Sequence, residues 1–282
     1  MKLARIAAPE FNLASTLGCG QVFHWLPRGE GYVGTIGDEP VYVEQRGHEL
    51  WTHTKPELVG SYFALDHPLT DIYRTFPSDP AMTQALTFCR GLRIIRQPRW
   101  ECLATFITSS MKQVAHIAQI SHTLRRRFGR KLSWRETELF AYPTPVDFAE
   151  LTEQQLRECA LGYRAKNLLA SARMIAGGEV DLERLRDLSD DAARTELCRL
   201  PGVGEKVANC VLLFAYERTR AFPIDVWIAR VLRETYFKRK RKITAQQLRN
   251  FSQKYFGEFG GYAQQYLFHH ARSTSSKKRA TG

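Results

Sequence analysis

Residues 200–212, LPGVGEKVANCVL, interrupt a helical pattern with one proline and two glycines and then begin a second helix. Two helices joined by so short a turn form a helix–hairpin–helix, in which glycines allow positive φ and the close approach of another backbone. The exposed N–H groups that open the second helix form an anion site. The pattern predicts that Gly202 and Gly204 bind a phosphate group, although an ordinary helix–helix turn would also use these residues.

Lys206 falls in the first turn of the second predicted helix. An ammonium group there opposes the positive end of the helix dipole, so this position does not stabilise the helix. The same field, with partial burial, favours the neutral amine. A neutral amine can attack a sugar C1′ and form a Schiff base. The local sequence alone favours the simpler role, in which Lys206 clamps a phosphate.

Asp225 follows Phe222-Pro223-Ile224 and directly precedes a predicted helix. Aspartate is a common N-cap at such a position. A carboxylate there could also stabilise the oxocarbenium-like state that develops when a glycosidic bond breaks, or move protons for the amine. The two roles are compatible, because capping fixes the carboxylate in place. The presence of Asp225 therefore favours the interpretation of Lys206 as a nucleophile over its interpretation as a phosphate clamp.

The balance of charge favours a polyanionic partner. The 282 residues include 41 Lys and Arg against 29 Asp and Glu, a formal net charge of +12, and the excess is concentrated in RRRFGRK (125–131), KRKRK (238–242) and KKR (277–279). Such clusters attract nucleic acid through counterion release without implying sequence specificity. A solvated surface with a disordered tail would explain the same excess, and KRKRK would also suit a nuclear import signal.

The cysteines and the apolar segments indicate an intracellular protein. Six scattered cysteines show no C-x-x-C spacing and no cluster with histidine, which predicts reduced thiols and no metal site. No cysteine follows Cys210, so a C-terminal iron–sulfur loop is excluded. No apolar run approaches the roughly 20 residues needed to span a bilayer, and the N-terminus lacks the apolar region of a secretory signal. We expect no membrane partner and no cofactor.

The sequence predicts an α+β fold with two parts. Up to residue 85, the short segments VFHWL, YVGTI, VYVEQ and ELWTH are separated by Gly, Pro and Asp and are typical of antiparallel strands. From residue 86 to 272 the apolar residues follow helical spacing, and a capping-box pattern begins at Thr152. We predict a sheet domain over 1–85, a helical domain over 86–272 and a disordered basic tail over 273–282.

The combination of LPGVGEKVA with PIDVW resembles the helix–hairpin–helix, Gly/Pro-rich, Asp-containing (HhH-GPD) superfamily of DNA glycosylases. In that family the lysine marks members that also cleave the DNA backbone, so the resemblance implies that Lys206 is the nucleophile and Asp225 the essential carboxylate. Four segments resemble one branch, the 8-oxoguanine DNA glycosylase/lyases: FNLASTLGCGQVFHW (11–25), ECLATFITSS (101–110), LGYRAKNLLASAR (161–173) and GYAQQYLF (261–268). This branch implies a TATA-binding-protein-like sheet domain before the glycosylase domain.

The resemblance also implies a pocket for an extruded base. The backbone carbonyl of Gly20 would accept the hydrogen that 8-oxoguanine carries on N7 and that guanine lacks. Gln264 would read the pairing edge of the base, Cys210 and Phe268 would sandwich it, and Phe23 would line the pocket. From the residues alone, Gly20 could be a turn glycine, Gln264 a surface side chain, and Cys210 and Phe268 ordinary core residues.

Further positions are expected to contact the opened duplex. Tyr163 matches the wedge that fills and kinks it, and Arg164 matches a contact to the orphaned cytosine. Met111 stands where eukaryotic members have an asparagine that contacts this cytosine, and His116 replaces a nearby arginine contact. Trp227 stands where a phosphate-binding histidine is common. These departures resemble a bacterial variant and predict weaker discrimination for cytosine opposite the lesion.

The sequence thus predicts a bifunctional DNA glycosylase/AP lyase of base excision repair. It would flip 8-oxoguanine out of damaged double-stranded DNA, excise it through a lysine Schiff base and nick the strand by β-elimination. We expect a monomer, in the cytoplasm with the nucleoid if bacterial and in the nucleus if eukaryotic. The alternatives are a related glycosylase for other oxidised or alkylated bases, and a non-catalytic helix–hairpin–helix DNA-binding protein that would need neither Lys206 nor Asp225.

Overall fold

The computed structural model describes residues 3–109, 112–237 and 242–280, with 275–280 described by backbone only. The N-terminal part of the chain forms a five-stranded antiparallel sheet. The strand order is β1-β5-β4-β3-β2, and two helices cover one face of the sheet. Side chains alternate between the two faces along β4, so that Val41 and Val43 join the core under these helices while Tyr42 faces away. The elements are β1 (Ala4–Ala7), α1 (Leu13–Gly18), β2 (Leu26–Arg28), β3 (Gly31–Ile36), β4 (Glu39–Arg46), β5 (Glu49–Thr52) and α2 (Pro56–Tyr62).

Three of the four predicted strands are confirmed, since YVGTI, VYVEQ and ELWTH form most of β3, β4 and β5. The prediction for VFHWL is wrong, because only its last residue belongs to a strand. The buried side chain of the preceding Gln21 donates to the carbonyl of Arg93 at 2.8 Å and accepts from the amide of Ile95 at 3.0 Å. These long-range bonds fix the segment to residues 93–95 instead of to the sheet.

A second hairpin, which the sequence analysis missed, covers the outer face of the sheet. Its strands are β6 (Lys131–Trp134) and β7 (Thr137–Phe140). Trp134 stacks on Tyr42 of β4, with ring centres 4.8 Å apart and ring planes 4° apart. The hairpin therefore protects an aromatic surface of the sheet from water.

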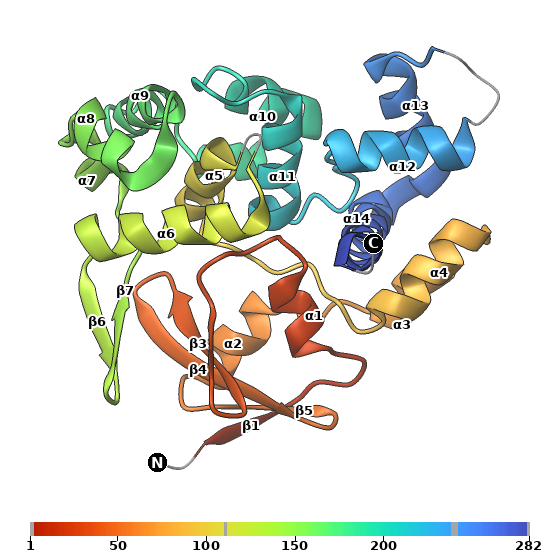
Figure 1. Ribbon diagram of the computed structural model, residues 1–282, viewed down its shortest axis with the longest axis horizontal. Coiled ribbons are helices and arrows are strands. Elements are labelled where there is room, and N and C mark those ends of the chain that lie inside the picture. Colours follow the sequence, from red (N-terminus) through yellow and green to blue (C-terminus); the bar gives the residue numbers. More distant parts are fainter. Residues whose placement is uncertain (1–2, 110–111, 238–241, 281–282) are drawn as a thin grey trace.

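The second part of the chain is helical, and α11 lies near its centre (Figure 1). Residues 207–214 of α11 are all buried, and a helix that is apolar on every side belongs inside a domain. The longer helix α6 passes between the sheet and the group formed by α5, α7, α8 and α9 (Figure 1). The helices are α3 (Leu69–Arg74), α4 (Pro80–Cys89), α5 (Arg99–Thr108), α6 (Val114–Phe128), α7 (Pro145–Ala149), α8 (Glu153–Leu156), α9 (Arg164–Ala176), α10 (Asp190–Leu197), α11 (Glu205–Tyr216), α12 (Val226–Tyr236), α13 (Ala245–Phe256) and α14 (Gly260–Ala280).

The structure differs from the predicted domain boundaries at residue 85 and at residue 273. Residue 85 falls inside α4, whose Met82 and Ala85 pack in the core of the helical part, and α4 lies against α14. The prediction of a disordered tail from residue 273 is wrong as far as Ala280, because α14 continues to that residue. Lysine, arginine and alanine are good helix formers, so the basic composition of this segment does not end the helix. Among the described residues, no helix is long and apolar enough to cross a membrane.

A buried ionic cluster joins the sheet to the helical part. Glu101 of α5 pairs with Arg125 of α6, and His24 contacts the same carboxylate at 3.1 Å. Arg125 also donates to the hydroxyl of Thr35 and to the carbonyl of Phe140, both at 2.9 Å. Burial alone would raise the pKa of Glu101, but Arg125 and His24 outweigh it and lower the pKa from 4.5 to about 2.

Glu101→Gln should destabilise the protein by about 3–5 kcal/mol, because it leaves the buried Arg125 guanidinium without its counter-charge. Since the pKa of Glu101 is lower in the fold than in the unfolded chain, this contribution is complete above about pH 5 and is lost as the pH falls towards 2. Urea unfolding at pH 7 measures the loss. Glu158→Gln, which removes an exposed partner of Arg127, is the control and should change stability little. Equal effects of the two substitutions would contradict the account.

Candidate active site

The hairpin between α10 and α11 is tightly held and open to solvent at its tip. Gly202 has φ +83°, and a Cβ there would lie 2.9 Å from the Cβ of Asn167, so only glycine fits. The hydroxyl of Ser171 on α9 donates to the carbonyl of Pro201 at 2.9 Å. Gly204 is the exposed N-cap of α11 and supplies no side-chain cap. The first N–H groups of α11 therefore have no side-chain cap and suit an anion, and phosphate binding at Gly202 and Gly204 stays a prediction.

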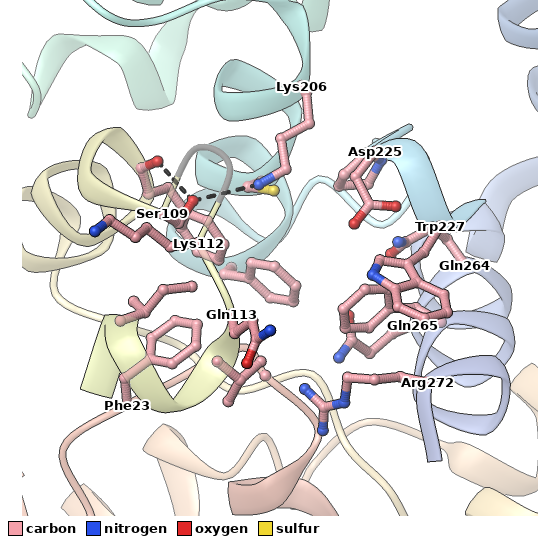
Figure 2. A pocket seen from close by; sticks show the side chains of 18 of the residues that line it. Phe23, Ser109, Lys112, Gln113, Lys206, Asp225, Trp227, Gln264, Gln265 and Arg272 are labelled. Atoms are coloured by element: carbon pink, nitrogen blue, oxygen red, sulfur yellow. Dashed lines mark hydrogen bonds between the residues drawn. The ribbon is translucent and has the colours of Figure 1, made fainter. Parts of the chain in front are cut away.

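One cavity of about 440 Å³ gathers all seven of the predicted catalytic and base-binding residues (Figure 2). It opens between α11, the turn before α12, α14, the start of α6 and the loop after α1. Segments from residue 20 to residue 268 therefore meet at one place. The predicted residues that line it are Gly20, Phe23, Lys206, Cys210, Asp225, Trp227, Gln264 and Phe268.

Lys206 extends from the first turn of α11 into this cavity. Its Nζ lies 3.5 Å from the hydroxyl oxygen of Ser109 and 5.1 Å from the centre of the Phe106 ring. The Ser109 hydroxyl donates to the carbonyl of Phe106 at 2.8 Å, so its lone pairs remain for the lysine amine. These contacts position the amine inside the cavity, where it can meet a substrate atom.

The structure confirms the capping role of Asp225, and its role in catalysis stays a prediction. It is the N-cap of α12, and its Oδ1 accepts from the amide of Ile228 at 2.8 Å. It also lines the cavity, at the same end as Lys206 in Figure 2. Burial raises the pKa of Asp225, while the Ile228 hydrogen bond and the charge of Lys206 oppose the rise. The cap fixes a carboxylate beside the cavity end that holds the amine.

Aromatic and thiol groups form apolar walls of the cavity. Cys210 lies one helical turn after Lys206 on α11 and is 3% exposed. Burial raises the pKa of the Cys210 thiol to about 11, although Lys206 opposes the rise, so the thiol is neutral at pH 7. Phe23 meets Phe106 edge-on, with ring centres 6.2 Å apart. Together with Phe268 on α14, these residues offer flat apolar surface for a planar ring.

Gln264 carries a buried polar atom without a protein partner. The residue is 4% exposed, and its Oε1 has no hydrogen bond among the described residues. Leaving a buried amide oxygen unpaired is unfavourable, so a ligand that donates to it gains that free energy. The neighbouring Gln265 has a structural role, because its Nε2 donates to the carbonyl of Cys19 at 3.0 Å.

Gly20 is both a turn glycine and part of the cavity wall. It has φ +89°, and a Cβ there would lie 2.6 Å from Nη1 of Arg272 and 3.4 Å from Cε1 of Phe268. Any side chain would therefore be strained and would displace the guanidinium. The backbone of Gly20 consequently lies directly against the cavity.

Of the residues predicted to contact the duplex, Trp227 lines the cavity, whereas Tyr163, Arg164 and His116 are not among the residues that line it. Tyr163 is 58% exposed and follows Gly162, whose φ is +58°. Arg164 is buried, with its guanidinium 4.4 Å from the centre of the Tyr163 ring and a hydrogen bond to the carbonyl of Leu161. His116 is exposed on α6. Met111 lies outside the described residues, and the DNA contacts of all five positions stay predictions.

The structure adds cavity residues that the sequence analysis missed. Helical spacing could have revealed Arg272, which lies one turn beyond Phe268 on α14. Lys112 and Gln113 follow the segment ECLATFITSS (101–110), but no motif in the sequence marks them as site residues. The missed polar residues are Ser109, Lys112, Gln113, Gln265 and Arg272. Within the described part of the chain, no group of three or more His, Cys, Asp or Glu side chains could hold a metal ion.

Comparison with known proteins identifies the family of this chain. Residues 4–103 match the family model of the 8-oxoguanine DNA glycosylase N-terminal domain, and residues 104–258 match that of the HhH-GPD superfamily of base excision DNA repair proteins. The chain is 30% identical over 239 residues to a probable N-glycosylase/DNA lyase of Methanothermobacter thermautotrophicus, which covers 78% of this chain and 75% of the relative. It is 28% identical over 287 residues to N-glycosylase/DNA lyase OGG1 of Arabidopsis thaliana, covering 94% and 78%.

A solved structure matches almost the whole fold. The 8-oxoguanine glycosylase/lyase of Clostridium acetobutylicum, in complex with double-stranded DNA that contains cytosine opposite 8-oxoguanine, superimposes with a TM-score of 0.92 at 30% identity. The match covers 97% of this chain and 96% of that one. The chain therefore belongs to the HhH-GPD superfamily of base excision DNA repair proteins and carries the N-terminal domain of 8-oxoguanine DNA glycosylases.

Proposed function

We propose that this protein is a bifunctional DNA glycosylase and AP lyase that removes 8-oxoguanine from double-stranded DNA. The observation that carries the proposal is the meeting of Lys206, Asp225 and Gln264 in one cavity of about 440 Å³. This volume lies in the range of small-molecule sites, roughly 300–1,000 Å³. An amine, a carboxylate and a buried unpaired amide oxygen supply a nucleophile, a stabilising charge and a reader of the base.

DNA binding precedes the chemistry. The N–H groups at the start of α11 bind a phosphate near the lesion, and the net charge of +12 attracts the duplex. The exposed Tyr163 enters the space that the extruded nucleotide leaves. The base then enters the cavity between Cys210 and Phe268, where the neutral thiol and the aromatic ring cover its two faces.

Base removal and strand cleavage share one covalent intermediate. The Lys206 amine attacks C1′ as the C1′–N9 bond breaks, and the electron pair of that bond leaves with the base. The Asp225 carboxylate stabilises the positive charge that develops on the sugar. The sugar ring opens to an imine, a proton leaves C2′, and the 3′ phosphate departs by β-elimination. Asp225, which lines the same end of the cavity as Lys206, moves the protons.

A panel of damaged duplexes tests the proposed substrate. Single-turnover assays compare 8-oxoguanine, 3-methyladenine, thymine glycol and undamaged guanine in one sequence. The expected result is excision with strand nicking for 8-oxoguanine, at least about 10²-fold faster than for the others, because a site built to hydrogen-bond one base rejects those that leave its groups unpaired. Faster removal of 3-methyladenine or thymine glycol would reassign the enzyme to another lesion.

The base opposite the lesion should influence excision only modestly. Met111 and His116 replace two polar groups that would read an orphaned cytosine, and Arg164 is already engaged within the fold. We expect excision rates opposite C, A, G and T to differ by less than about tenfold, since one remaining hydrogen bond contributes about 0.5–1.5 kcal/mol. Single-turnover rates on the four duplexes measure this. A preference for cytosine above about 10²-fold would show that Arg164 or another group suffices.

The oligomeric state and the place of action of the protein are also proposals. The protein acts as a monomer, because one cavity contains both the nucleophile and the base-reading residues. Its place of action follows its substrate, which is genomic DNA in the cytoplasm of a bacterium or in the nucleus of a eukaryote.

A further inference from the structure

Three residues of α14 present different chemistry along one side of the cavity. Gln264, Phe268 and Arg272 are spaced four residues apart, and side chains at this spacing lie on the same face of a helix. All three line the cavity. The face therefore offers a carboxamide, then an aromatic ring, then a guanidinium to a single ligand.

Arg272 is held at the wall that Gly20 forms. Its Nη2 donates to the carbonyl of Gly18 at 2.5 Å, and its Cζ lies 5.5 Å from the centre of the Phe268 ring. The space that a side chain on Gly20 would need is occupied by Nη1. Burial lowers the pKa of Arg272 from its usual 12.5, and arginine nevertheless remains protonated in proteins. A positive group with several N–H donors thus faces the cavity.

The positions of Arg272 and Lys206 in the cavity indicate which part of a bound base the Arg272 guanidinium would face. Figure 2 shows Lys206 and Asp225 at one end of the cavity and Arg272 at the other, projecting from α14 towards the interior. Because Lys206 must reach C1′, the glycosidic N9 of a bound purine lies at the Lys206 end. The C6 substituent of a purine is on the side of the ring system remote from N9. Arg272 also lies against Gly20, whose carbonyl would face N7, so the guanidinium faces the C6 group on the N7 side of the ring and not the C2 group.

We propose that Arg272 selects purines that carry a carbonyl at C6, by donating a charge-assisted hydrogen bond to O6. This inference rests on the proposed function and names a specificity-determining residue for it. The 6-oxo group of 8-oxoguanine accepts such a bond, whereas the 6-amino group of 8-oxoadenine would place two donors against each other. A buried donor that meets a donor loses its partner, which penalises the wrong base strongly.

The competing interpretation is that Arg272 only supports the turn at residues 18–20 through its bond to Gly18. A supporting role would lower the excision of every base in parallel. A role in reading O6 would change the ratio between the two bases. Glutamine at position 272 distinguishes the supporting role from the role in reading O6, because its carboxamide can rotate and accept a hydrogen bond from an amino group.

The experiment measures single-turnover excision of 8-oxoguanine and of 8-oxoadenine, each opposite cytosine, by the wild type, R272Q and R272K. Incision at a preformed abasic site checks that the Lys206 chemistry is intact, because it needs no base. R184Q, an exposed arginine outside the cavity, is the matched control and should behave as the wild type. We expect the wild type to prefer 8-oxoguanine by at least about 10²-fold.

R272Q should remove 8-oxoguanine about 10- to 100-fold more slowly and 8-oxoadenine faster than the wild type, with abasic-site incision within about threefold. R272K keeps a charged donor and should retain the preference for 8-oxoguanine. An unchanged ratio in R272Q, with both bases removed more slowly, would overturn the proposal. If R272Q does not fold, as judged by its melting transition, R272M gives the same test, since it removes the donor and should also lose the preference. A wild type that removes neither base but incises abasic DNA would contradict the proposed function instead.

Discussion

Lys206→Gln should abolish borohydride trapping on an 8-oxoguanine duplex and lower excision by at least about 10³-fold, while DNA binding changes less than about threefold. The amine is the only group of this side chain that can form an imine, and glutamine keeps much of its length. The phosphate contacts come from the hairpin backbone, which the substitution leaves in place. Gel analysis of trapped complexes and a fluorescence titration at fixed salt measure the two effects.

Two other lysines serve as controls for this substitution. Lys112 is the second lysine among the described residues that line the cavity, so Lys112→Gln tests whether the neighbouring amine reacts instead. Lys254 is exposed on α13, outside the cavity, and Lys254→Gln controls for the loss of one positive charge. Both variants should still be trapped. Trapping that persists in Lys206→Gln and disappears in Lys112→Gln would move the nucleophile to Lys112.

Asp225→Asn should lower the excision of 8-oxoguanine by about 10²–10⁴-fold with little loss of stability. Asparagine caps helices as well as aspartate does, so the bond to the amide of Ile228 survives and α12 remains fixed. What disappears is the negative charge beside the sugar. Because burial raises the pKa of Asp225, the acidic limb of the wild-type rate profile should also lie above the ordinary aspartate value of 3.8.

Asp79 provides the matched control for that prediction. It is the N-cap of α4, its carboxylate accepts from the amides of Ala81 and Met82, and it is not among the residues that line the cavity. Asp79→Asn should leave excision unchanged. Single-turnover rates and thermal melting of the two variants separate charge from capping. Near-wild-type excision by Asp225→Asn would reduce Asp225 to a helix cap.

Short local patterns predicted the backbone structure around Lys206 and Asp225 well. The turn between α10 and α11, the position of Lys206 and the capping role of Asp225 follow from short segments whose backbone preferences are strong. The roles of Cys210 and Phe268 needed the resemblance, because a residue that lines a cavity and a residue that fills the core have the same apolar character. Cys210 is 3% exposed and also borders the cavity, so it belongs to the core while its contact with a base stays a prediction.

Structural features that depend on contacts between residues far apart in the chain could not be predicted from the sequence. The segment VFHWL has the composition of a strand, but Gln21 binds it to residues 93–95, which lie far along the chain. The β6–β7 hairpin is defined by stacking on Tyr42, which no local pattern encodes. Arg272 was overlooked because it follows the last segment of the resemblance, at the end of the predicted helical domain, and only the fold brings its guanidinium to Gly18, 254 residues earlier in the chain.

The central claim is that Lys206 forms the Schiff base at the lesion, and peptide mapping tests it most directly. Wild-type protein is reduced with borohydride on an 8-oxoguanine duplex, digested with nuclease and protease, and analysed by mass spectrometry. The account predicts a sugar adduct on Lys206. An adduct on Lys112 or on another amine, or excision without any adduct, would contradict it.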